Sequence, residues 1–171
     1  CVIRKLQKNT QMAESTIRTI PNKILIPDIA KLLEEGIEVK LQAKGRSMSP
    51  YIRDMKDLLV LQKVIRQDLE VEDIVLARCG KDHYVIHRII EINGDEIVLM
   101  GDGNVYGTER CKREDVLGKL IAIERKGKRI DCNTAQERKK AYRLRTCYRT
   151  YAKTRHFVKR ILTLQIFKNE N

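Results

Sequence analysis

The chain has 171 residues, a formal net charge of +12 and 42% hydrophobic residues. This length allows one compact domain with an appendage but not two full domains, and the apolar content is enough for a hydrophobic core. No apolar run approaches the roughly 20 residues that a bilayer requires, so we expect no transmembrane helix.

The N-terminal segment has basic residues without an apolar stretch behind them, unlike a secretory signal, and we expect a cytoplasmic protein. The chain begins with Cys1, and Met12 is a plausible start of translation. We expect a flexible segment over residues 1–22, a β domain over residues 23–130 and a basic helical tail over residues 131–171.

The cysteines are odd in number, widely spaced and without any Cys-x-x-Cys pair. They are Cys1, Cys79, Cys111, Cys132 and Cys147. This spacing argues against a zinc site and against a disulfide framework, and it favours reduced thiols.

Charge is concentrated near the C-terminus. Residues 124–171 hold 15 Lys and Arg but only 4 Asp and Glu, which leaves them +11 of the net +12. The chain therefore has a nearly neutral first region and a strongly basic second region.

The first region has mainly β character. Residues 27–35 have the pattern of a short helix closed by Gly36. Six runs typical of strands follow. They are Ile37 to Ala43, Leu58 to Gln62, Asp73 to Cys79, Tyr84 to Ile92, Glu96 to Met100 and Val116 to Glu124. Asn93-Gly94-Asp95 predicts a hairpin turn. The fold class expected is mainly β (α+β), a small coiled β-sheet or barrel.

The second region, from about Thr134, has helical periodicity. Its apolar residues recur at three- and four-residue steps among Arg and Lys. They are Ala141, Leu144, Tyr148, Tyr151, Val158, Ile161 and Leu162. This pattern predicts one basic amphipathic helix, or two helices broken near Thr154.

Two segments of the first region suggest a nucleophile and its base. Ser47 and Ser49 lie on a turn that glycine opens and proline closes, and a serine hydroxyl attacks only when a base takes its proton and donors hold the oxyanion. His87 lies on an expected strand, where alternation places it with Val85 and Ile89. Partial desolvation there favours the neutral, basic imidazole. Spacing alone does not choose between the two serines.

Four boxes then resemble, in order, those of signal peptidase I and the related self-cleaving repressor peptidases. Ser47-Met48-Ser49-Pro50 resembles the Ser-Met-x-Pro box, and Glu72-Asp73-Ile74-Val75 resembles the Gly-Asp-(Ile/Val)-Val strand. His87-Arg88-Ile89-Ile90 resembles the box of the general base, and Gly101-Asp102-Gly103-Asn104 resembles the Gly-Asp-x-Asn box. The resemblance covers roughly residues 37–123.

The resemblance implies a role for each matched position. Ser47 is the implied nucleophile, and His87 followed by Arg88 is the implied base, as in the archaeal and endoplasmic-reticulum branch. Asp102 would orient the imidazole or shape the site, and Met48 would line the pocket for a small substrate side chain. No metal or organic cofactor is required.

The chain departs from the family at three points. Gly45 replaces a serine that often helps to form the oxyanion hole, so the hole would depend on backbone N–H groups such as that of Ser47. We expect the chain to lack the membrane anchor typical of signal peptidases. For the acidic and arginine positions that follow Asn104, the candidates are Glu109 and Arg110.

Each of these features has an ordinary structural explanation as well. A Ser-Met-x-Pro tetrapeptide alone is more often chance than an active site. A strand histidine is commonly a core or surface residue, and Met48 fits an ordinary core position. Asp102 between two glycines fits a turn residue that caps its own backbone.

The basic tail has three interpretations. It packs its apolar stripe on the β domain, or it lies on an anionic membrane surface, or it attracts nucleic acid nonspecifically. The expected location remains cytoplasmic, and the second interpretation adds peripheral contact with the inner face of the cytoplasmic membrane as an option.

The function predicted is that of a serine endopeptidase that cleaves a leader or precursor peptide. The alternative is a catalytically inactive peptide-binding module that docks on membrane or nucleic acid through its tail, and repressor-type self-cleavage is a third option.

Overall fold

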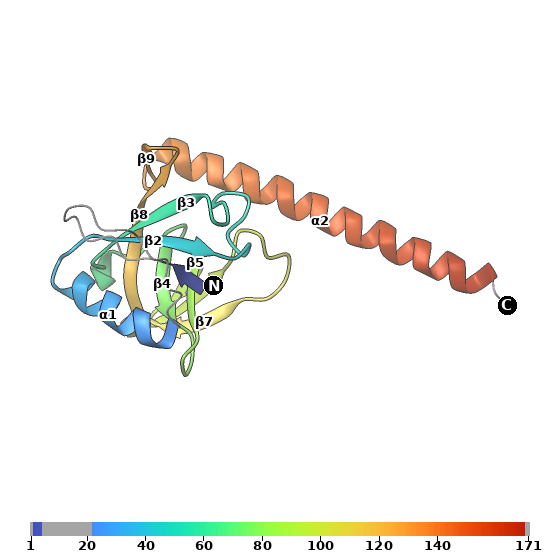
Figure 1. Ribbon diagram of the computed structural model, residues 1–171. Coiled ribbons are helices and arrows are strands. Elements are labelled where there is room, and N and C mark those ends of the chain that lie inside the picture. The colour runs from blue at the N-terminus through green and yellow to red at the C-terminus, as the bar shows by residue number, and fades with distance from the viewer. Residues whose placement is uncertain (1, 5–21, 170–171) are drawn as a thin grey trace.

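The computed structural model describes residues 2–4 and 22–169, and the side-chain surroundings of residues 24–42 and 44–155 (Figure 1). Its helices and strands are, in chain order, β1 (Val2–Arg4), α1 (Asn22–Glu34), β2 (Val39–Lys44), β3 (Asp57–Gln62), β4 (Ile74–Arg78), β5 (Tyr84–Asn93), β6 (Glu96–Met100), β7 (Glu109–Lys112), β8 (Val116–Arg125), β9 (Lys128–Asp131) and α2 (Ala135–Asn169). Two short 3-10 helices, Arg66–Asp68 and Arg113–Asp115, lie between strands.

The strands form one antiparallel sheet in the order β1-β2-β3-β8-β4-β5-β6-β7, with β9 paired to β8. The pairing register shifts within the pairs β3 with β8, β4 with β8 and β5 with β6. Such bulges bend strands and increase their twist, so the sheet curls on itself. The predicted fold class, a mainly β domain with a small coiled sheet, is confirmed.

The curled sheet encloses two groups of buried apolar side chains. The larger group joins α1 to one face of the sheet, where Leu33 reaches Gly118 of β8 so closely that a Cβ at Gly118 would lie 2.6 Å from the Leu33 Cδ1. The second group lies between β4, β5, β6 and β7 and includes Val85 and Ile89. These two residues therefore share a face of β5, as strand alternation predicts.

Helix α1 begins at Asn22, five residues before the predicted start at Pro27, which lies inside the helix. Burial of Leu25 and Ile26 extends the apolar face toward the N-terminus and outweighs the helix-breaking tendency of proline. The helix ends as predicted at Gly36, which has φ +81° and donates its N–H to the Leu33 carbonyl at 2.9 Å.

All six predicted strands are present within two residues of their expected bounds, and Gly94 (φ +61°) turns the predicted hairpin between β5 and β6. Strands β7 and β9 were not predicted, because both are short and rich in charged residues. Strand β1 and the first residue of α1, Asn22, fall in the segment expected to be flexible, and residues 1 and 5–21 lie outside the described residues.

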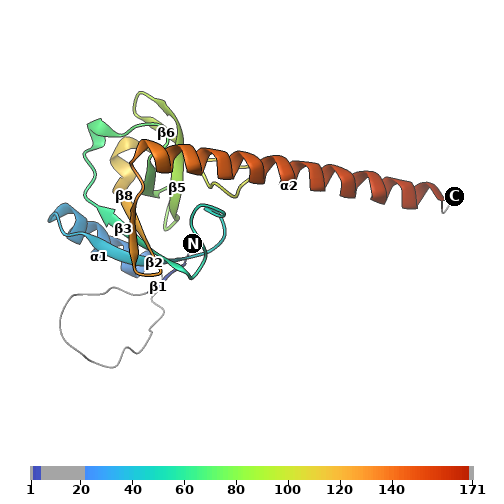
Figure 2. The ribbon, with the colours of Figure 1, turned by 90° about the horizontal axis from the view of Figure 1, so that it is seen from above.

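Helix α2 is a single helix, uninterrupted at Thr154, which leaves the body of the molecule and projects beyond it (Figures 1 and 2). Thr134 caps its start, because its side-chain oxygen accepts from the Glu137 N–H at 3.3 Å. In the described part of the chain, no helix is both long and apolar enough to cross a membrane.

The face by which α2 packs differs from the predicted apolar stripe. Only Ala141 of the stripe's described residues is buried, whereas Leu144, Tyr148 and Tyr151 are exposed. The docked face is instead basic, and Arg145 keeps only 7% of its surface exposed. The stripe prediction was wrong here because acidic side chains just before β4, Glu70, Glu72 and Asp73, pair with arginines of this helix. An apolar face would leave these carboxylates without partners.

The loop that carries the predicted nucleophile is anchored at its far end by Asp57. This carboxylate is fully buried and accepts hydrogen bonds from Arg53 and from Arg125 of β8, whose Nη2 also donates to the Tyr51 carbonyl at 2.8 Å. Burial alone would raise the pKa of Asp57, but the guanidinium groups outweigh burial and lower it.

Asp57→Asn should lower the free energy of unfolding at pH 7 by about 2 kcal/mol, because two arginines lose their carboxylate. Since the folded-state pKa is lowered, the native carboxylate stabilises the fold at neutral pH, and this contribution is lost as the pH falls through that pKa. Urea unfolding from pH 7 to pH 3 should therefore show the two proteins converging. Asp28→Asn, on the exposed face of α1, is the control and should change little; an equal loss in both would contradict the anchor.

Candidate functional site

Ser47 lies in the loop between β2 and β3, residues 45–56, which we call the Ser47 loop. Gly45 opens it with φ +129° and donates its N–H to Asp54 Oδ1 at 2.9 Å. The Ser49 N–H donates to the Arg46 carbonyl at 3.0 Å, so Ser47 lies inside a tight turn and is half-buried. The backbone of the predicted nucleophile is therefore held on both sides.

Buried side chains fasten this loop to the core. Met48, Tyr51 and Ile52 all belong to the larger apolar group, and the Ile52 N–H donates to the Met48 carbonyl at 2.9 Å. Met48 thus occupies a core position, which is the ordinary interpretation of this residue. Its packing holds the neighbouring Ser47 at the edge of the core.

A second turn, Gly101–Gly103, presses against the Ser47 loop, and we call it the glycine turn. The Gly103 N–H donates to the Ser47 carbonyl at 2.8 Å. A Cβ at Gly101 would overlap the same carbonyl oxygen, and a Cβ at Gly103 would lie 2.8 Å from the carbonyl oxygens of Arg46 and Ser49. Only glycine permits this approach of two backbones.

The glycine turn also places the Ser47 loop next to the strand of His87. Met100 of β6 pairs with Arg88 of β5, so continuing the antiparallel register sets Gly101 opposite His87. The structure therefore brings the segments of Ser47 and His87 together, with Gly101 between them. Among the contacts of the described residues, no hydrogen bond joins the Ser47 hydroxyl to the imidazole.

His87 is buried, and its imidazole hydrogen-bonds a carboxylate. Its Nδ1 lies 2.9 Å from Oε2 of Glu109, the first residue of β7. Because a carboxylate accepts, the proton of the neutral ring sits on Nδ1 and leaves Nε2 with a free lone pair. Burial lowers the pKa of His87, and the nearby Glu109 charge opposes this only in part.

Of the two candidates for the acidic and arginine positions, Glu109 contacts His87, whereas Arg110 pairs with Glu96 on the exposed surface at 2.7 Å. Glu109 is half-buried on a short strand that hydrophobic patterning did not reveal. Its place in the family order made it a candidate, and the fold of β7 against β6 brings it to His87.

Asp102 contacts Arg88 and not His87. Its fully buried carboxylate accepts from Arg88 Nε at 2.8 Å and from Arg88 Nη2 at 2.7 Å. Burial alone would lower the pKa of Arg88, but the Asp102 carboxylate raises it. The pair ties the glycine turn to β5, and among the contacts of the described residues Asp102 has none with the imidazole that it was predicted to orient.

Arg88 has further partners that sequence reasoning missed. Its Nη1 donates to the Glu72 carbonyl at 2.8 Å, and its guanidinium lies 5.5 Å from the centre of the Tyr51 ring. Glu72 has φ +82°, a left-handed conformation that favours glycine. In the sequence, the available signal was that Glu72 stands where the family's Gly-Asp-(Ile/Val)-Val box has glycine.

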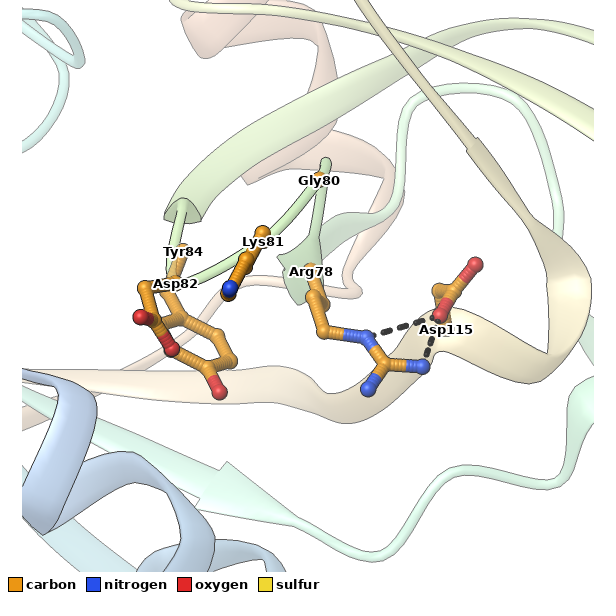
Figure 3. Close-up of a pocket in the computed structure, with 6 residues that line it drawn as sticks. All are labelled: Arg78, Gly80, Lys81, Asp82, Tyr84 and Asp115. Atoms are coloured by element: carbon orange, nitrogen blue, oxygen red, sulfur yellow. Dashed lines mark hydrogen bonds and ion pairs between the residues drawn. The ribbon is translucent and has the colours of Figure 1, made fainter.

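One hollow of the surface, of about 410 Å³, lies elsewhere, at the turn between β4 and β5 (Figure 3). Its lining residues are Arg78, Gly80, Lys81, Asp82, Tyr84 and Asp115. Arg78 closes one side by donating to Asp115 at 2.6 Å. None of these residues belongs to the Ser47 loop or the glycine turn. A separate observation is that, within the described residues, no group of three His, Cys, Asp or Glu side chains is arranged to hold a metal ion.

Comparison with known proteins gives one match. A family model described as Peptidase S24-like matches residues 10–121, about two thirds of the chain. No curated protein matches the chain. No solved structure matches it either. The matched region includes the Ser47 loop, His87, the glycine turn and Glu109.

Gly101→Ala should lower the free energy of unfolding by about 2–3 kcal/mol, because the added methyl group overlaps the Ser47 carbonyl. Gly36→Ala is the matched control: its Cβ would meet no atom within 4 Å. It should lose about 1 kcal/mol from backbone strain alone. Urea unfolding followed by circular dichroism measures both. A Gly101→Ala protein as stable as the parent would contradict the close contact.

Proposed function

We propose that this chain, which belongs to the Peptidase S24-like family, is a serine endopeptidase that cleaves a leader or precursor peptide. Ser47 is the nucleophile, His87 the general base and Glu109 the group that orients the base. The family supports a peptidase in general terms. The choice of these three residues rests on the geometry of the Ser47 loop and β5.

The observation that carries the proposal is the His87–Glu109 hydrogen bond beside the Ser47 loop. A buried imidazole whose Nδ1 is held by a carboxylate presents a basic Nε2 at neutral pH, which is what activation of a serine hydroxyl requires. The register of β5 and β6, continued by one residue, sets the backbone of His87 opposite Gly101, whose turn contacts the Ser47 loop, and this supports the proposed pairing.

The proposed reaction has two steps. Ser47 Oγ attacks the scissile carbonyl carbon while His87 Nε2 takes the hydroxyl proton, and the resulting imidazolium gives that proton to the leaving amine. Water then attacks the acyl-enzyme with the same base, releases the new carboxyl end and restores the Ser47 hydroxyl. The Glu109 carboxylate stabilises the imidazolium in both steps.

The oxyanion of the tetrahedral intermediate needs hydrogen-bond donors. Position 45 is glycine and supplies no hydroxyl, so backbone N–H groups take this role. The Ser47 N–H has no acceptor among the described residues and remains available. The turn geometry of the loop fixes its direction before the substrate arrives.

The second candidate function is that of a catalytically silent peptide-binding module. Two observations on the described residues favour it. No hydrogen bond there joins Ser47 to His87, and the basic residues of α2 up to residue 155 are largely exposed, which suits an anionic membrane or nucleic acid. Covalent labelling of Ser47 distinguishes the two functions, because a silent module has no activated hydroxyl.

Ser47→Ala and His87→Ala should each reduce peptide cleavage by at least about 10³-fold. Purified full-length protein would be incubated with a set of leader peptides and, separately, with a fluorophosphonate probe that acylates activated serines. Ser49→Ala is the matched control, because its hydroxyl donates to the Ile52 carbonyl at 3.4 Å and has no role in the reaction. Labelling that survives Ser47→Ala, or an inert parent protein, would remove the proposed mechanism and favour the silent module.

Glu109→Gln should reduce kcat by about 10²-fold, because the imidazolium loses its counter-charge while the hydrogen-bond acceptor remains. The Glu109 charge raises the pKa of His87, so its removal should move the acidic limb of the kcat/KM profile to lower pH. Glu114→Gln, at an exposed carboxylate, is the control. An unchanged acidic limb in Glu109→Gln would show that Glu109 does not act on the base.

A further inference from the structure

We propose that helix α2 is a positioning element of the Ser47–His87 site, holding the glycine turn in place through Glu72 and through the Gly101 carbonyl. The activity part of this inference rests on the proposed function. The structural part does not, because it concerns how the two turns are held together.

The first connection runs from Arg145 through Glu72. Both terminal nitrogens of Arg145 donate to the two carboxylate oxygens of Glu72, one of them at 2.6 Å. Burial alone would raise the pKa of Glu72, but Arg145 lowers it, so the carboxylate is charged at neutral pH. A two-pronged contact of this kind fixes direction as well as distance.

Glu72 continues the connection into the site. Its Oε2 lies 3.8 Å from Nη1 of Arg88, and its carbonyl accepts from the same nitrogen. Arg88 in turn holds Asp102 in the glycine turn. One glutamate therefore links a helix far along the chain to the buried pair beside Ser47.

The left-handed backbone of Glu72 indicates that contacts of its side chain stabilise a conformation that glycine would adopt more easily. A non-glycine residue at φ +82° carries a cost in backbone strain relative to glycine. The cost is offset by the contacts of its carboxylate with Arg145 and Arg88. Glycine would relieve the backbone strain but would break the link to α2.

The second connection is direct. Arg149, one helical turn beyond Arg145, donates from Nη2 to the Gly101 carbonyl at 3.0 Å. Burial lowers the pKa of Arg149, and the neighbouring Arg145 lowers it further. The helix thus contacts Gly101, the residue that lies between the Ser47 loop and the strand of His87.

Both connections converge on one measurable hydrogen bond, from the Gly103 N–H to the Ser47 carbonyl. Loss of the α2 contacts frees Arg88 and the glycine turn, so this bond should open more often even while the sheet stays folded. An amide that opens more often exchanges its proton faster. The exchange rate of Gly103 therefore reports on positioning without any reference to catalysis.

The experiment compares Arg145→Gln with Arg143→Gln in the full chain. Arg143 lies on the exposed side of the same helix, so the two variants lose the same charge. Arg145→Gln should raise the Gly103 exchange rate, measured by NMR, about tenfold, and Arg143→Gln should leave it unchanged within about twofold. On a cleaved peptide, Arg145→Gln should lower kcat about tenfold with KM unchanged.

Glu72→Gly keeps the test decisive if Arg145→Gln folds poorly, because glycine suits the observed backbone. It should raise Gly103 exchange as Arg145→Gln does. Normal Gly103 exchange in both variants would overturn the inference, as would faster exchange with unaltered kcat. Faster exchange in a protein whose parent form cleaves no peptide would uphold the positioning by α2 and refute the proposed function instead.

Discussion

The buried ion pair between Arg88 and Asp102 is the contact on which the rest of the site depends. It joins β5 to the glycine turn, and that turn holds the Ser47 carbonyl. Two charges removed from water are tolerated only when each is fully hydrogen-bonded, and here Arg88 has a carboxylate, a carbonyl and an aromatic ring around it. Loss of either partner would leave the other charge buried and would separate the elements that the pair connects.

Strand β5 presents His87 on one face and Arg88 on the other. His87 points with Val85 and Ile89 into an apolar group, where burial keeps the imidazole neutral and Glu109 sets its proton on Nδ1. Arg88 points to the opposite face and organises the turns. Adjacent residues of one strand therefore have different partners, because side chains alternate between faces: the proposed base contacts Glu109, and Arg88 contacts the glycine turn.

Much of the fold could be predicted from local pattern. The six predicted strands follow from runs of apolar residues, and the end of α1 follows from Gly36. Each of these signals lies within a few neighbouring residues of the sequence. Strand β7 could not be found in this way, because its pairing with β6 and not its own composition makes it a strand. The packing of α2 was mispredicted for a similar reason: the docked side of the helix was decided by carboxylates distant in sequence, Glu72 among them.

The sequence by itself determined the class of the fold, the order of its motifs and the candidate histidine, since these depend on residue type and spacing. The choice of Ser47 over Ser49 came from the resemblance of its box and not from spacing. Only the tertiary structure decided which carboxylate meets which base. Asp102 pairs with Arg88, and Glu109 hydrogen-bonds His87. The register of β5, β6 and β7 sets the distances between these side chains, and that register results from the packing of the whole sheet.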